Sequence, residues 1–236
     1  LEETDVVMDD MVARHISEIT TGRERFLKGA PYFVGLPRRS LPERRGLGST
    51  GIVGRGYFQS FTNLEKHSRF VSGRMAVDSV TGGPGGPTIE AVVSLQTSQK
   101  LRIGVDDMLT LTASIGANNT ISVRIVGVIE PVDITDIYWS NARTFLDPEP
   151  LTEILPPGLT VPADEPPLPL FVARSAMVDA MEIAYPGLLV YGTSITSIHI
   201  DTELLKDWSL AKSRRRLGAF ERDISRSMPG VSATTG

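Results

Sequence analysis

The chain has 236 residues, of which 41% are hydrophobic and 22% are charged, and its net charge is -4. This composition indicates a folded protein with a sizeable core, in one large domain or two small ones. The negative charge disfavours general nucleic-acid binding. Because the sequence contains no cysteine, disulfides, thiolate metal sites and cysteine nucleophiles are excluded. No stretch approaches the about 20 apolar residues of a membrane span. The chain begins with Leu1 rather than Met, and we interpret it as a part excised from a longer protein.

The N-terminal region is predicted to contain a helix and then a basic loop. Apolar residues at three- and four-residue spacings predict a helix over residues 6–19, ended at Gly22. Residues 32–34 predict a short strand. It leads into an arginine-rich loop that contains Arg38, Arg39, Arg44 and Arg45.

The next part of the chain contains glycine-rich segments. The glycines of residues 46–56 predict a loop or an irregular strand edge. Residues 63–67 predict one helical turn, and residues 70–74 predict a strand that runs into a turn. The segment 82–87 alternates glycine pairs with proline, which is typical of a flexible linker. We therefore expect a junction between subdomains there.

The central stretch is predicted to be rich in strands. A strand over 88–94 is followed by a short amphipathic segment and then by a hairpin, in which apolar residues alternate over 109–115 and over 121–125. The alternation stops at Val126 to Ile129, which predicts burial on both faces, and Gly127 predicts a bulge or a close backbone approach.

The C-terminal third follows a second break at 147–169, where eight of the sixteen prolines lie. A buried strand over 169–172, a helix over 175–184 and a strand over 194–201 are predicted next. One long helix is then expected over 202–228. Its apolar stripe consists of Leu210, Leu217, Phe220, Ile224 and Met228.

Known catalytic and cofactor patterns are not found in the sequence. There is no Gly-x-Ser-x-Gly elbow and no P-loop lysine, and the acid pairs Asp9-Asp10 and Asp106-Asp107 point apart on any regular backbone. The three histidines lack metal-ligand spacing, and we interpret each as structural. We therefore predict no catalytic, cofactor-binding or metal-binding residue in this chain.

Two groups of residues remain as candidates for contact with a partner or a membrane. Arg214, Arg215 and Arg216 either form a solvated helix face or, together with the loop arginines, meet anionic lipid headgroups or an acidic partner. Tyr138 and Trp139 either pack on the core or contact a hydrophobic partner.

The chain resembles the extracytoplasmic domain of ABC-transporter permeases of the FtsX/MacB-like family over roughly residues 57 to 225. It departs from the family pattern at Asp106, where the family often has glycine. Its motifs are degenerate and include no catalytic residue. The segments that carry the resemblance are Phe70–Met75, Glu90–Ser94, Leu101–Leu111, Val123–Ile129, Asp136–Trp139 and Pro169–Met181.

The resemblance implies a mixed α+β fold. Residues 1–75 and 169–236 would form a larger porter-like part, and residues 76–168 a small inserted subdomain rich in strands. The chain would be no enzyme: ATP would bind a separate cytoplasmic ATPase, coupled to this domain through membrane helices outside the chain. The resemblance also allows a dimer of the full-length protein.

The implied role is to engage a lipoprotein, lipid, peptide or cell-wall enzyme outside the membrane and to transmit movement. Two alternatives stay open. One is a free-standing extracellular solute-binding or adhesion module, and the other is a hydrolase with an unrecognised site, which would need titratable residues clustered in a pocket.

Overall fold

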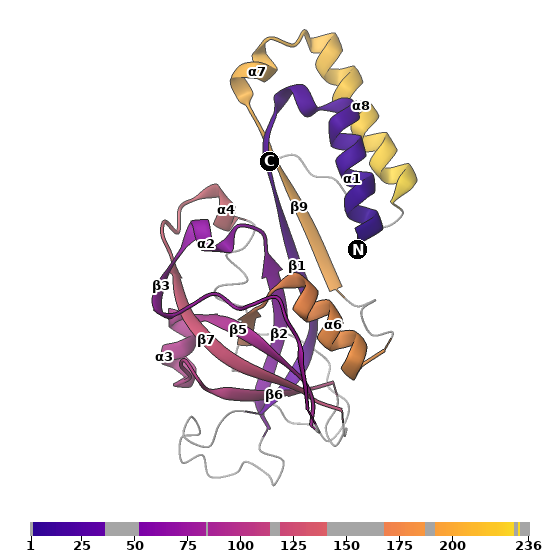
Figure 1. Ribbon diagram of the computed structural model, residues 1–236. Coiled ribbons are helices and arrows are strands. Elements are labelled where there is room, and N and C mark those ends of the chain that lie inside the picture. The colour runs from indigo at the N-terminus through magenta and orange to yellow at the C-terminus, as the bar shows by residue number, and fades with distance from the viewer. Residues whose placement is uncertain are drawn as a thin grey trace. The chain divides into compact units, whose positions relative to one another are not determined.

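The computed structural model describes residues 2–35, 52–83, 85–113, 119–140, 168–186, 192–228 and 231 (Figure 1). The loop with Arg38, Arg39, Arg44 and Arg45 and nearly all of segment 147–169 lie outside these residues. The described part is a mixture of helices and a mixed sheet, so the predicted α+β class is confirmed.

The chain divides into two compact units. Unit 1 consists of Leu1–Glu24 together with Thr196–Gly236, and unit 2 is the continuous segment Arg25–Ile195. Strands β1 (Thr20–Gly35) and β9 (Gly192–Ile200) each contribute residues to both units. These limits differ from the predicted ones at residues 75 and 169, and strands from both predicted parts pair in one sheet.

Unit 2 is organised around that sheet. Its order is β3-β7-β6-β1-β2-β8-β5-β4, and an additional pairing of β7 with β5 joins β1, β2, β8, β5, β7 and β6 in a closed ring. The further strands are β2 (Ile52–Phe61), β3 (Ser68–Gly73), β4 (Thr81–Gly83), β5 (Gly86–Ser94), β6 (Met108–Thr112), β7 (Ile121–Pro131) and β8 (Leu168–Phe171).

The predicted hairpin is β6 with β7, which pair antiparallel with Leu109 opposite Val123. Their alternating apolar residues lie in the core, where helix α6 (Arg174–Ala184) contributes Met177 and Ala180. β7 is buried on both faces from Val126 to Ile129, as its loss of alternation predicted. Helix α3 (Leu95–Leu101) follows β5 and begins at Ser94, whose hydroxyl accepts from the amide of Thr97.

Tight backbone approaches fix the end of the β3–β7 ladder. A Cβ on Gly127 would lie 2.3 Å from the carbonyl oxygen of Arg74, so only glycine fits, and the predicted close approach is confirmed. Gly73 has φ +75° at the turn that leaves β3. Asp106 has φ +70°, in the left-handed region that glycine adopts most readily.

Several predicted boundaries are wrong. Gly22 does not end a helix, because β1 already begins at Thr20. The predicted linker 82–87 is part of a β4–β5 hairpin in which Gly82 pairs with Pro87. Of the segment 46–56, predicted as a loop or an irregular strand edge, residues 52–56 form the start of β2. In each case backbone pairing with a neighbouring strand overrides the low strand propensity of glycine.

Unit 1 is formed by both ends of the chain. Helix α1 (Glu2–His15) and the 3₁₀ turn η1 (Ser17–Ile19) pack with α7 (Thr202–Lys206) and α8 (Leu210–Ser227). The single predicted helix 202–228 is thus two helices, because the Ser209 side chain caps α8 by accepting from the amide of Lys212. None of the described helices is long and apolar enough to cross a membrane. The core residues of unit 1 are Met8, Met11, Ile16, Ile19, Trp208, Phe220, Ile224 and Met228.

Candidate functional site

Tyr138 and Trp139 lie on the single-turn helix α4 (Ile137–Ser140) and are buried, with 2% and 0% of their surfaces exposed. They join an aromatic cluster on one face of the sheet, where Trp139 packs against Phe61 and Phe61 meets Phe171 edge-on at 5.2 Å. Of the two interpretations of this pair, packing on the core is the one that the side chains adopt.

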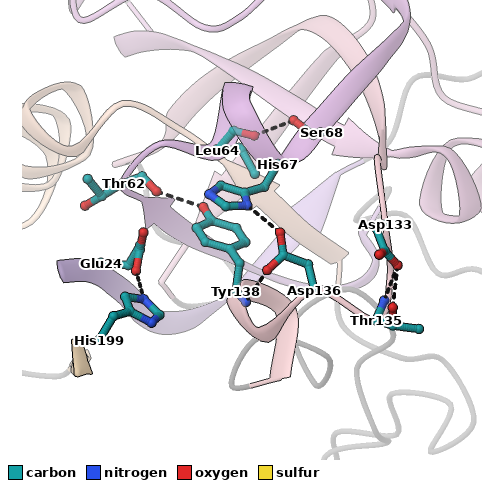
Figure 2. A network of polar contacts seen from close by, with 10 residues as sticks. All are labelled: Glu24, Thr62, Leu64, His67, Ser68, Asp133, Thr135, Asp136, Tyr138 and His199. Carbon is teal, nitrogen blue, oxygen red and sulfur yellow. Dashed lines mark hydrogen bonds and ion pairs between the residues drawn. The ribbon is translucent and has the colours of Figure 1, made fainter. Parts of the chain in front are cut away.

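A polar network holds α4 against the short helix α2 (Leu64–His67), as Figure 2 shows. His67 stacks on Tyr138 with ring centroids 3.8 Å apart, and its Nδ1 lies 2.8 Å from a carboxylate oxygen of Asp136. The other oxygen of Asp136 accepts from the amide of Tyr138, whose hydroxyl donates to the carbonyl of Thr62. The network therefore ties the segment after β7 to the segment after β2.

The other two histidines also face carboxylates. In unit 1, His15 Nε2 lies 2.8 Å from Asp223, and this hydrogen bond lowers the pKa of the Asp223 carboxyl. His199 is paired with Glu24 in the same unit. Each histidine thus has a structural partner, and no group of three or more metal-ligating side chains occurs within the described residues.

A hollow of about 260 Å³ opens in unit 2 where the parallel strands β2 and β8 end. Its walls are mainly apolar, with Phe61, Leu64, Met75 and Phe171 among them, while Arg174 at the start of α6 is the basic residue of the lining. Small-molecule sites usually enclose about 300–1,000 Å³. The hollow is therefore slightly smaller than a usual small-molecule site.

The segment after β3 forms one wall of this hollow. An ion pair and a backbone hydrogen bond hold it in place. The Arg74 guanidinium donates two hydrogen bonds of 2.6 Å to the Glu90 carboxylate, which also accepts from the amide of Val77. These donors hold the pKa of Glu90 below its usual value, with Arg74 the larger cause. Because Met75 lies between these two fixed points, contacts within unit 2 position this wall of the hollow.

Three exposed aliphatic side chains that were not predicted from the sequence lie on the segment after β7. Figure 2 shows the hydrogen bonds that Asp133 and Asp136 make in this segment. Val132, Ile134 and Ile137 are 62%, 48% and 67% exposed. Asp133 accepts from both the amide and the hydroxyl of Thr135. The aspartates of this segment are hydrogen-bonded, whereas the three aliphatic side chains are exposed to solvent. The only signal in the sequence is this interleaving of aspartates with aliphatic residues directly after β7.

The structure separates the three arginines of α8. Arg216 donates to the carbonyl of Arg14 at 2.8 Å and approaches Glu18 at 3.5 Å, so it helps to join α8 to α1 and η1 inside unit 1. Arg214 and Arg215 are exposed. The predicted cluster is therefore divided between a structural arginine and two that face solvent.

Comparison with protein-family models and with curated proteins gives no match for this chain.

Proposed function

We propose that this chain is the extracytoplasmic domain of an ABC-transporter permease of the FtsX/MacB-like kind, which engages a partner outside the membrane and moves when a separate ATPase turns over. The observation that carries the proposal is the pairing of α1 with α8 in unit 1. The two helices run in opposite directions, so the first residues of α1 and the last residues of α8 lie at the same end of the unit (Figure 1).

The contacts along the pair support this arrangement. The end of α1 meets the second half of α8 through His15, which bonds Asp223 and lies 6.5 Å from the ring of Phe220. Beyond it, Glu18 of η1 meets Lys212 near the start of α8 at 2.6 Å. Such an antiparallel pair suits a domain inserted between two neighbouring membrane spans, because its chain must leave and return at one place.

The proposed role requires that the domain bind a partner, and surfaces of unit 2 are suited to this. The hollow at the ends of β2 and β8 and the exposed Val132, Ile134 and Ile137 both present apolar groups on a backbone that is already fixed. A preorganised surface loses little entropy when it binds. Transmission then requires that a partner contact these surfaces differently in the two states of the transport cycle.

The test is to determine the full reading frame around the chain. The proposal expects apolar runs of about 20 residues shortly before Leu1 and after Gly236, with an ATPase that copurifies with the full-length protein. A stop codon soon after Gly236, with only a signal peptide upstream, would refute it. The exposed apolar residues of unit 2 would then belong to a free-standing binding module.

A further inference from the structure

The outer face of α8 carries an arginine stripe that the sequence run Arg214–Arg216 does not reveal. On a helix with 100° per residue, Arg222 lies about 20° to one side of Arg215 and Arg226 about 20° to the other. Phe220 and Ile224, which are buried, lie on the opposite side. Arg215, Arg222 and Arg226 are all exposed and form a line about 16 Å long.

The positive charge of this stripe is only partly offset within the described part of the chain. Arg215, Arg222 and Arg226 make no ion pair there, unlike Arg216 or Lys212, and only Arg226 lies near enough to Asp223 to help lower the pKa of that carboxyl. The acids of α8 lie elsewhere on the helix, with Asp223 turned toward His15 and Glu221 on the flank near Arg214. The stripe is therefore a cationic surface on a chain whose net charge is negative.

Small residues lie between the arginines on this face of α8. Ala211, Gly218 and Ala219 fall on this face by helical spacing. The Arg222 guanidinium lies back over Gly218, with a nitrogen 3.3 Å from the position of a Cβ there. A low helix surface flanked by arginines can approach a plane of phosphates closely, and each guanidinium can then donate two hydrogen bonds to phosphate oxygens.

We propose that Arg215, Arg222 and Arg226 bind the phosphate headgroups of an anionic phospholipid surface. The choice of a membrane over another polyanion rests on the proposed function, because α8 would then lead the chain back toward the bilayer. No aromatic side chain accompanies the stripe, so it lacks the stacking platform of single-stranded nucleic-acid binders.

The experiment measures cosedimentation of the chain with vesicles of phosphatidylcholine that contain phosphatidylglycerol, and with phosphatidylcholine alone. We expect binding to the anionic vesicles only, reversed by salt. An arginine at an anionic surface contributes about fivefold in binding, so the triple variant Arg215→Glu, Arg222→Glu and Arg226→Glu should lose about a hundredfold or more. Circular dichroism and thermal melting will establish that the variant remains folded.

A matched control is the triple variant Lys66→Glu, Lys100→Glu and Lys206→Glu, which changes the net charge equally at other exposed positions. It should retain most of the binding, and so should Arg→Lys at the three stripe positions, since the charge is kept. Equal losses in the two glutamate variants would overturn the proposal in favour of a net-charge effect. So would absence of binding to anionic vesicles, or binding to soluble inorganic polyphosphate as tight as to vesicles. None of these outcomes depends on the reading frame, so this proposal and the proposed function can fail separately.

Discussion

Replacing Gln59 with methionine should stabilise the protein, although glutamine is polar and the substitution removes hydrogen-bonding groups. Gln59 lies on β2 with none of its surface exposed, and neither its amide nitrogen nor its amide oxygen has a hydrogen-bond partner in the described part of the chain. Its neighbours two residues away on the strand are Tyr57 and Phe61, both in an apolar cluster. Methionine has nearly the same length and shape and leaves no buried polar atom.

The size of the effect follows from the burial. A buried amide without hydrogen bonds destabilises a protein by about 1–3 kcal/mol relative to an apolar group of the same shape. The Gln59→Met variant should therefore gain about 1–3 kcal/mol in the free energy of unfolding, measured by urea denaturation. In thermal melting this corresponds to about 2–4 °C for each kcal/mol in a chain of this size.

A control separates this effect from a general preference for methionine. The control variant is Gln99→Met, which makes the same chemical change at an exposed position of α3. Its free energy of unfolding should change by less than about 0.5 kcal/mol. If Gln59→Met leaves the stability unchanged or lowers it, the amide is hydrogen-bonded in the folded protein and the reasoning is refuted.

Other substitutions test the backbone and the ion pairs. Gly218→Ala should stabilise α8 by about 0.5–1 kcal/mol in urea denaturation, because only the mobile end of Arg222 must shift; a loss would mean that the helix backbone is distorted there. Asp106→Ala should cost about 1 kcal/mol and Asp106→Gly should not, since φ is +70°; equal costs would point to the side chain instead. Arg74 keeps the pKa of Glu90 low, so this carboxylate stabilises the fold at neutral pH and the stabilisation is lost as the pH falls below about 4. Arg74→Gln should flatten the fall of the urea midpoint in that range, and an unchanged profile would contradict this account.

The parts of the fold that could be predicted from the sequence have a clear hydrophobic period. The alternation of Leu109 and Leu111 with threonines predicted β6, and its counterpart from Ile121 to Ile125 predicted β7. The prediction was less accurate at glycine-rich segments, because their strand pairing depends on residues far away in the chain. The start of β2 reads as a loop or an irregular strand edge, and Gly54 and Gly56 pair there with Val34 and Tyr32 of β1.

The candidate surfaces were harder to predict, because adjacency in sequence differs from adjacency on a helix. Arg214, Arg215 and Arg216 point about 100° apart in turn, so the sequence run becomes one structural arginine and two exposed ones. Arg222 and Arg226 were not singled out, since they are separated by Asp223 and the apolar Ile224. The buried amide of Gln59 gives no signal in the sequence at all.

The division of the chain into units also sets an order of events in folding. All of unit 2 is encoded in one uninterrupted segment, whereas every contact of α1 with α8 must wait until the last helix has been synthesised. The hydrogen bond of His15 to Asp223 closes a separation of 208 residues, and that of Arg14 to Arg216 closes 202. Closing so long a loop in an unfolded chain is entropically unfavourable, and prior folding of the intervening segment shortens the loop that remains. Unit 1 should therefore complete last. During synthesis the apolar face of α1 would stay exposed until α8 emerges.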